Sequence, residues 1–176
     1  MKVSDATILM LAEREALDHG HWLDRWASRL STAVHVPPVG SLAPMGRRPD
    51  PDDDPLPEMV EGAPGPVVAV AYGGGVERLV RHAETAPVRG AFMVAPRPGG
   101  EAEARVDPLP FPSILVASRD DPACPYDVAE DMGARWGSHV VDAGEAGRID
   151  AASGRGPWPE GLMVFAKFLS HLPKEA

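Results

Sequence analysis

The chain has 176 residues, of which 44% are hydrophobic, and it carries a net charge of −9. This length fits a single domain spanning residues 1–176, which buries about two-thirds of the surface that the unfolded chain exposes. The acidic balance argues against nucleic acid or an anionic membrane as the partner, because phosphate binding needs clustered lysines and arginines. No apolar run approaches the roughly 18 residues of a membrane span, and no signal-peptide pattern follows Met1, so we expect a cytoplasmic protein.

Short apolar runs alternate with segments of helical periodicity along nearly the whole chain. Buried strands are predicted at residues 6–11, 33–36, 67–71, 90–95, 113–117 and 139–141. Helices are predicted at residues 18–30, 76–85, 125–136 and 159–172. The alternation indicates an α/β fold, a three-layer α/β/α sandwich around a mostly parallel sheet, with ligand sites at the carboxyl ends of the strands.

One segment departs from this alternation. Nine prolines lie between Pro37 and Pro66, and the acidic run 50–54 lies among them. Proline lacks the amide hydrogen that a helix interior requires. Residues 37–65 are therefore predicted to form a surface loop with at most a short turn near residues 57–60.

The strand predicted at residues 67–71 leads directly into Tyr72, Gly73, Gly74 and Gly75, and then into a helix. This is the context of a nucleophile elbow, G-x-S-x-G, in which small residues flank a nucleophile on a sharp turn. Gly73 stands where the nucleophilic serine belongs. The glycines match neither a spaced G-x-G-x-x-G nor a P-loop, so we expect no nucleotide cofactor.

Metal chemistry is also not expected. Cys124 is the only cysteine, which excludes an internal disulfide and a cysteine-based zinc site. The six histidines are scattered and form no H-E-x-x-H motif. We therefore predict neither a metal nor another cofactor.

Four further segments match the motifs of one known family. They are His21-Trp22, Ser118-Arg119-Asp120-Asp121-Pro122, residues 145–150 (Glu-Ala-Gly-Arg-Ile-Asp) and residues 153–161 (Ser-Gly-Arg-Gly-Pro-Trp-Pro-Glu-Gly). Together with the elbow-like turn, they resemble the retinoblastoma-binding-protein-9-like, or YdeN-like, family of small serine hydrolases over roughly residues 6–172. The resemblance implies a compact α/β-hydrolase fold with nucleophile, acid and base in that order along the chain.

The family's catalytic roles carry over only in part. The acid position falls on Asp121 and is retained, whereas the nucleophile position falls on Gly73 and the base position on Arg148. Glycine offers no nucleophile, and a guanidinium stays protonated near neutral pH, so it cannot act as a general base. The family's oxyanion loop falls on residues 12–16, which contain no glycine. The resemblance also implies that His21 and Trp22 lie beside the pocket mouth.

These substitutions favour a pseudoenzyme over a working serine hydrolase. Its cleft would bind a small carboxylate or acyl ligand, or a protein partner, through the amides of residues 73–75, the charge of Arg148 and the hydroxyl of Tyr72. Asp121 is expected to lie close to Arg148, and we predict a structural, bidentate ion pair between them in place of the contact between acid and histidine that the family has. The alternative is that Asp121 closes the next turn while Arg148 points to solvent.

Two other functions stay open. The first is an enzyme repurposed for a cyclisation, isomerisation or lyase step, with Tyr72, Asp121, Arg148 and His21 as its polar groups. The second is an esterase-like hydrolase with a displaced nucleophile, such as Cys124 or Tyr72. The tail segment 154–161 is interpreted as structural, with Trp158 packing the last helix onto the sheet.

Overall fold

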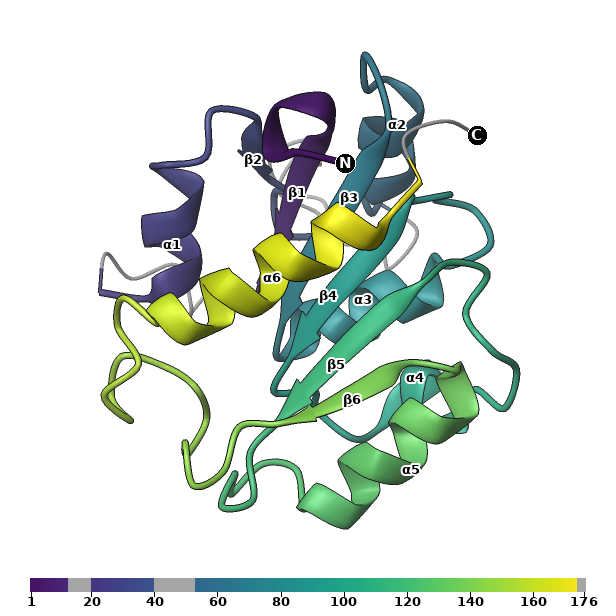
Figure 1. Cartoon of the computed structure of the whole chain (residues 1–176). Coiled ribbons are helices and arrows are strands. Elements are labelled where there is room, and N and C mark those ends of the chain that lie inside the picture. Colours follow the sequence, from purple (N-terminus) through teal and green to yellow (C-terminus); the bar gives the residue numbers. More distant parts are fainter. Residues whose placement is uncertain (13–19, 40–52, 174–176) are drawn as a thin grey trace, which may run out of the picture.

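The computed structural model describes residues 1–12, 20–39 and 53–173, and its centre is a six-stranded parallel sheet (Figure 1). The strands are β1 (Thr7–Leu11), β2 (Ala33–His35), β3 (Val67–Tyr72), β4 (Gly90–Val94), β5 (Ser113–Ala117) and β6 (His139–Asp142). Their order in the sheet is β2-β1-β3-β4-β5-β6. The strand order therefore reverses between β1 and β3, and the crevice at the carboxyl ends of these two strands is where open α/β sheets bind ligands.

Helices cover both faces of the sheet. Two of them, α1 (Trp22–Ala27) and α6 (Pro159–His171), lie on the face turned toward the viewer in Figure 1. The opposite face carries α2 (Leu56–Glu61), α3 (Gly74–Arg81), α4 (Gly100–Ala104) and α5 (Tyr126–Trp136). The three-layer α/β/α sandwich predicted from the sequence is confirmed. Within the described ranges, no helix is long and apolar enough to cross a membrane.

The core under α1 and α6 is aromatic. The Trp158 ring stacks on Trp26 at 5.8 Å between centroids and meets Trp22 edge-on at 4.9 Å. Phe165 of α6 packs against Trp26 and Phe92. Trp158 is itself buried, so the packing role predicted for the tail segment is confirmed.

All six predicted strands and the four predicted helices are present, with shifted ends. The helix predicted at residues 18–30 is found as α1, and its residues 18 and 19 lie outside the described residues. A 3-10 turn at Val3–Asp5 and the short α4 were not predicted.

The proline-rich segment contains more structure than expected. The helix α2 lies where the sequence predicted at most a short turn, and it buries Leu56 and Val60. Its prolines stand at Pro55 and Pro57, at the helix start, where a missing amide hydrogen breaks no intrahelical bond. Residues 40–52 of the same segment lie outside the described residues.

A buried charge cluster joins this segment to α3. The Arg78 guanidinium donates to both carboxylate oxygens of Asp54, at 2.7 Å from Nε and 2.5 Å from Nη2. His82 Nε2 lies 3.1 Å from the same carboxylate, and the Leu56 amide donates to it at 2.9 Å. The second half of α3, the helix that follows the elbow, is therefore anchored by Asp54.

Candidate functional site

The turn between β3 and α3 has the backbone geometry that an elbow requires. Gly73 has φ 57° and ψ −123°, a conformation that side chains with a Cβ rarely adopt. Its amide donates to the carbonyl of Val94 at 3.0 Å, which fixes the turn against the end of β4. The strand–turn–helix context predicted from the sequence is thus present, with glycine at its apex.

Gly75 is required by close packing. A Cβ added there would lie 2.5 Å from the carbonyl oxygen of Leu11, at the end of β1. Because backbone cannot yield like a flexible side chain, only glycine fits. The first turn of α3 is therefore pressed against the carboxyl end of β1, at the crevice where the strand order reverses. Of the predicted oxyanion loop that follows β1, residues 13–16 lie outside the described residues.

Tyr72 ties the elbow to the loop that carries Arg148. Its hydroxyl donates to the backbone carbonyl of Arg148 at 2.9 Å. Its ring is buried and meets the His21 ring edge-on, with 4.5 Å between centroids. The hydroxyl predicted as a ligand group therefore has a structural partner.

The rings of His21 and Trp22 pack against Tyr72 at the elbow, and both residues are buried; their expected place at a pocket mouth stays a prediction. His21 caps α1, with Nδ1 accepting from the Leu23 amide at 3.2 Å, so its proton is on Nε2. The Trp22 indole donates to the carbonyl of Ile149 at 2.8 Å. The early pair thus helps to hold the segment next to Arg148.

Asp121 is 8% exposed at the start of the loop after β5. Its Oδ1 accepts from the Ala123 amide at 2.8 Å and closes the next turn. Burial raises the pKa of the Asp121 carboxyl above its usual value, although the Ala123 amide and the charge of Arg148 act in the opposite direction.

The predicted ion pair between Asp121 and Arg148 is wrong. Both residues are described, and no hydrogen bond or contact within 4.0 Å joins the guanidinium to the carboxylate. Arg148 acts on Asp121 through its charge alone. The alternative, in which Asp121 closes the next turn, is the arrangement found, but Arg148 is half-buried and its Nε is buried rather than in solvent.

Two residues that sequence reasoning left without a role hold the Arg148 loop in place. Ser118 Oγ donates to Asp120 at 2.7 Å and accepts from the Ala146 amide at 2.9 Å. Asp120 in turn accepts from the Gly147 amide at 2.8 Å. The hydrogen bond from Ser118 lowers the pKa of Asp120. The available signal was the residue types themselves, because serine and aspartate side chains that follow a strand often bond to nearby backbone amides.

Comparison with known proteins agrees with this geometry. The sequence profile of the serine hydrolase family matches residues 14–167. This chain belongs to the serine hydrolase family. No curated protein matches it.

Solved structures similar to this serine hydrolase family member include a protein from Pectobacterium atrosepticum described as a YdeN-like hydrolase. It is 25% identical, with a TM-score of 0.81 over 97% of this chain and 95% of its own. The ydeN gene product of B. subtilis is 14% identical, with a TM-score of 0.70 over 94% and 99% of the two chains. A protein of the α/β hydrolase superfamily from Xanthomonas campestris is 16% identical, with a TM-score of 0.68 over 96% and 99%. These likenesses establish the α/β-hydrolase fold.

The site of this serine hydrolase family member contains one thiol, and it is poorly suited to attack a substrate. Cys124 is 2% exposed, and its Sγ donates to the Pro125 carbonyl at 3.7 Å. Burial raises the pKa of the Cys124 thiol to about 11, and the nearby charge of Asp121 adds to the shift. Because the thiolate is the nucleophilic form, Cys124 is inert near neutral pH.

Proposed function

We propose that this chain is a serine hydrolase family member that does not hydrolyse substrates through a serine and instead binds a small carboxylate or acyl compound beside the elbow. The observation that carries the proposal is Gly73, which keeps the backbone geometry of the elbow without a nucleophilic side chain. Acyl transfer requires a nucleophile and a base that takes its proton. Arg148, at the position that the resemblance gives to the base, is a permanent cation.

Binding of an anion is favoured by the electrostatics around the elbow. The charge of Arg148 reaches both Asp121 and Asp150, since it lowers the pKa that each would otherwise have. The positive end of the α3 dipole begins at Gly74, close to the turn. A carboxylate placed between them would meet positive potential from two directions. The Gly73 amide does not take part, because it donates to Val94.

A displaced nucleophile has less support. Cys124 is buried with a pKa of about 11, and the Tyr72 hydroxyl donates to the Arg148 carbonyl. Either group would have to leave its place in the packed structure before it could attack a substrate.

A repurposed, non-hydrolytic enzyme is the second candidate, and Asp121 is the observation that favours it. A buried carboxyl with a raised pKa next to a cation is a common form of general acid or base. In this candidate Asp121 would exchange a proton with the ligand that Arg148 holds. Two results would favour this candidate over simple binding. The natural protein would convert a bound carboxylate to a product, and Asp121→Asn would bind the same carboxylate without converting it.

Reaction with a fluorophosphonate probe tests the loss of serine hydrolysis. We expect no labelling of the natural protein and no cleavage of p-nitrophenyl esters. The double variant Gly73→Ser with Arg148→His should be labelled if the turn still presents residue 73 as an elbow does, whereas each single variant should not. Labelling of the natural protein would overturn the proposal.

Thermal unfolding with a panel of small carboxylates tests binding. We expect a rise in Tm with the carboxylate that binds, and a smaller rise for Arg148→Gln. The matched control is Arg29→Gln, an exposed arginine after α1, which changes the net charge equally. If no carboxylate of the panel raises the Tm of the natural protein, the proposed binding is contradicted. The proposed loss of serine hydrolysis would not be affected.

A further inference from the structure

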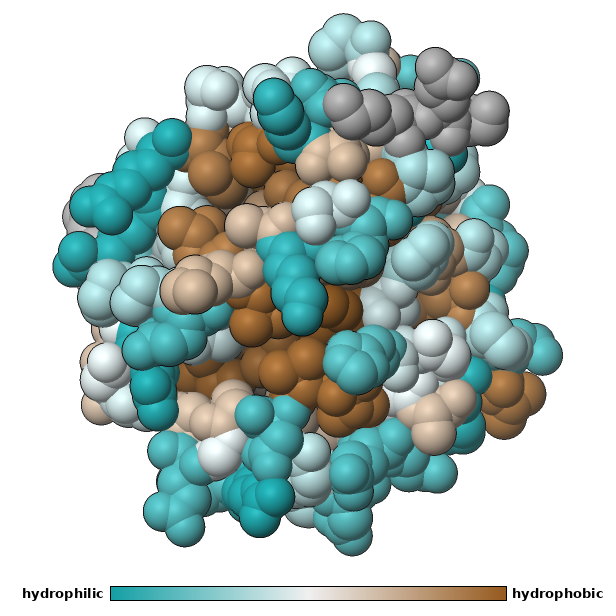
Figure 2. Space-filling view, in the orientation of Figure 1, coloured by the Kyte–Doolittle hydropathy of each residue, from teal (hydrophilic) through white to brown (hydrophobic). Residues whose placement is uncertain are grey.

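A second hollow lies on the α6 face, between this helix and the edge strand β6. It has a volume of about 420 Å³, within the range of small-molecule sites. Its floor is apolar and includes Ile114, Val141, Val164 and Phe168. Figure 2 shows hydrophobic side chains gathered in this part of the surface, below the course of α6. No helix covers β6 on this face (Figure 1), as far as the chain is described.

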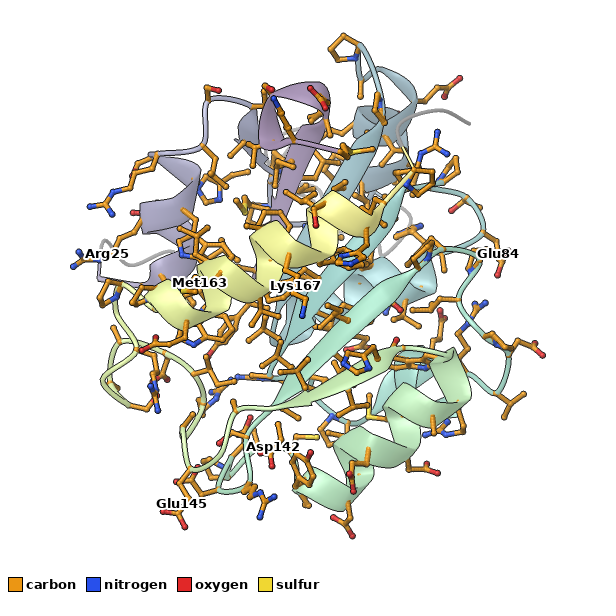
Figure 3. The ribbon with its side chains drawn as sticks, in the orientation of Figure 1. Arg25, Glu84, Asp142, Glu145, Met163 and Lys167 are labelled. Carbon is orange, nitrogen blue, oxygen red and sulfur yellow. The ribbon has the colours of Figure 1, made fainter. Side chains whose placement is uncertain are left out.

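The rim of this hollow carries one positive charge, at Lys167. Lys167, His139 and His171 line it, and no acidic residue does so among the described residues. Figure 3 shows the Lys167 side chain leaving α6 on the side of β5 and β6. The His171 ring uses Nδ1 in a hydrogen bond with the Lys167 carbonyl at 2.7 Å, which turns Nε2 away from the helix. On a chain of net charge −9, such a patch selects anions.

The apolar floor continues toward the carboxyl end of the sheet. A neighbouring hollow of about 220 Å³ shares Val141 and Val164 with the first and is lined further by apolar residues up to Trp158 and by the charged residues Asp142, Arg155 and Glu160. Through these shared residues the two hollows join into one elongated groove, with Lys167 at the His171 end, an apolar middle at Val141 and Val164, and charges of both signs at the far end. This shape matches a ligand with a charged head and a linear hydrocarbon tail.

We propose that this groove binds a linear amphipathic anion of the medium-chain fatty acid type. The carboxylate lies at the Lys167 ammonium, and the alkyl chain lies over Val141 and Val164 toward Trp158. The groove is lined by none of the elbow residues 72–75, so the proposal is independent of the function assigned to that site.

Calorimetric titration with decanoate tests both parts of the ligand. We expect decanoate to bind, and affinity to fall about tenfold for each two methylenes removed. Neutral 1-decanol and cationic decyltrimethylammonium should bind more weakly than decanoate. Equal binding of all three ten-carbon ligands, or no binding of decanoate, would overturn the proposal.

Variants locate the ligand. Lys167→Gln should weaken decanoate binding about two- to fivefold, as expected for an exposed charge, and Lys167→Glu should weaken it further. Arg25→Gln on α1 removes an equal charge outside the groove and should leave the affinity unchanged (Figure 3). A loss of decanoate binding in Arg148→Gln, with Lys167→Gln unaffected, would place decanoate at the elbow and overturn the proposal. An equal loss in Lys167→Gln and Arg25→Gln would contradict a site at the groove.

Val164→Trp tests the apolar floor. The larger side chain should fill the groove and abolish decanoate binding while circular dichroism stays native. Sedimentation velocity on the natural protein and on the same variant tests whether a second copy of the chain occupies the groove instead. If the natural protein is a dimer that Val164→Trp dissociates, the groove is covered by a second copy and the fatty acid proposal is wrong.

Discussion

Gly73 has the backbone conformation that a nucleophile elbow requires. At φ 57° and ψ −123°, a residue with a Cβ is strained, and such strain is found where a catalytic side chain must be held exposed. With glycine at the apex, the turn keeps its course without this strain. This chain thus keeps the turn of an elbow without the nucleophilic side chain.

Substitution of Gly73 measures the strain directly. Gly73→Ala should lower the free energy of unfolding by about 1–3 kcal/mol, the usual magnitude for a residue forced into a sparsely populated conformation. Urea denaturation gives the difference. Gly65→Ala is the control, because a Cβ there meets nothing within 4 Å and φ is not positive, and its effect should stay within about 0.5 kcal/mol. Equal losses of unfolding free energy in the two variants would show that the turn adopts another backbone conformation without strain.

Asp121 offers a test through pH. Its folded pKa is raised, so this carboxyl contributes stability below its unfolded pKa, and that contribution is lost as pH rises through the folded pKa. Asp121→Asn keeps an oxygen for the Ala123 amide and removes the buried charge. We expect the variant to equal or exceed the natural protein in unfolding free energy at pH 7, with the difference shrinking toward pH 3.

The opposite result for Asp121 has a clear meaning. An Asp121 carboxylate paired with a cation would make Asp121→Asn destabilising by about 3 kcal/mol or more at pH 7. Urea titrations between pH 3 and pH 7 separate the two cases. A large loss at neutral pH would restore the ion pair with Arg148 that the sequence suggested.

The positions of these residues could be predicted from the sequence, but their contacts could not. The motif order placed Gly73, Asp121 and Arg148 after three different strands, and the structure brings their loops together at one edge of the sheet. The direction of a long arginine side chain depends on burial and on every nearby group. The role of Ser118 depends on a loop 26 residues further along the chain, through its bond to the Gly144 carbonyl.

Among the elements, the strands were the most predictable and the short helices the least. Runs such as residues 67–71 are buried on both faces, and a short continuous apolar pattern before a glycine turn is typical of a central strand in a parallel sheet. The helix α2 has only six residues and two prolines at its start. The helix is stable because Leu56 and Val60 are buried and because Asp54, just before it, is bonded to Arg78. These tertiary contacts cannot be predicted from the local sequence pattern.

The contact between Asp54 and α3 can be tested by removing the charge. Asp54→Asn leaves the buried Arg78 guanidinium without its partner and should lower the unfolding free energy by about 3–5 kcal/mol. Glu58→Gln, on the exposed side of α2, is the matched control and should change it by less than about 0.5 kcal/mol. A similar small effect for both would mean that α2 is held by its apolar contacts alone.

The same pair predicts a dependence on pH. Burial alone would raise the pKa of Asp54, but the hydrogen bond and charge of Arg78 outweigh it and lower the pKa below its usual value. A lowered folded pKa contributes stability above the unfolded pKa, and that stability is lost as pH falls through the folded value. The natural protein should therefore lose unfolding free energy between about pH 5 and pH 3 more steeply than Asp54→Asn.

At the scale of the whole molecule, one sheet supports two different cores. The face under α1 and α6 is filled by Trp22, Trp26 and Trp158, whereas the opposite face contains Trp136. The candidate site lies at the carboxyl edge, where loops from both layers meet. The fatty acid groove lies on one layer only, over strands β5 and β6. A ligand at the elbow would therefore contact the loops at the carboxyl edge of the sheet, whereas a ligand in the groove would contact α6 and strands β5 and β6.

Because both layers pack on the same strands, we expect the chain to unfold as a single cooperative unit. Trp136→Phe leaves tryptophan fluorescence as a reporter of the α1 and α6 layer, while far-ultraviolet circular dichroism reports all helices. In urea the two signals of this variant should give the same midpoint and slope, as two-state unfolding requires. An earlier fluorescence transition would mean that α1 and α6 detach while the sheet and the opposite layer persist. In that case the groove under α6 would be lost before the elbow, and the chain would behave as two units rather than the one domain proposed from its length.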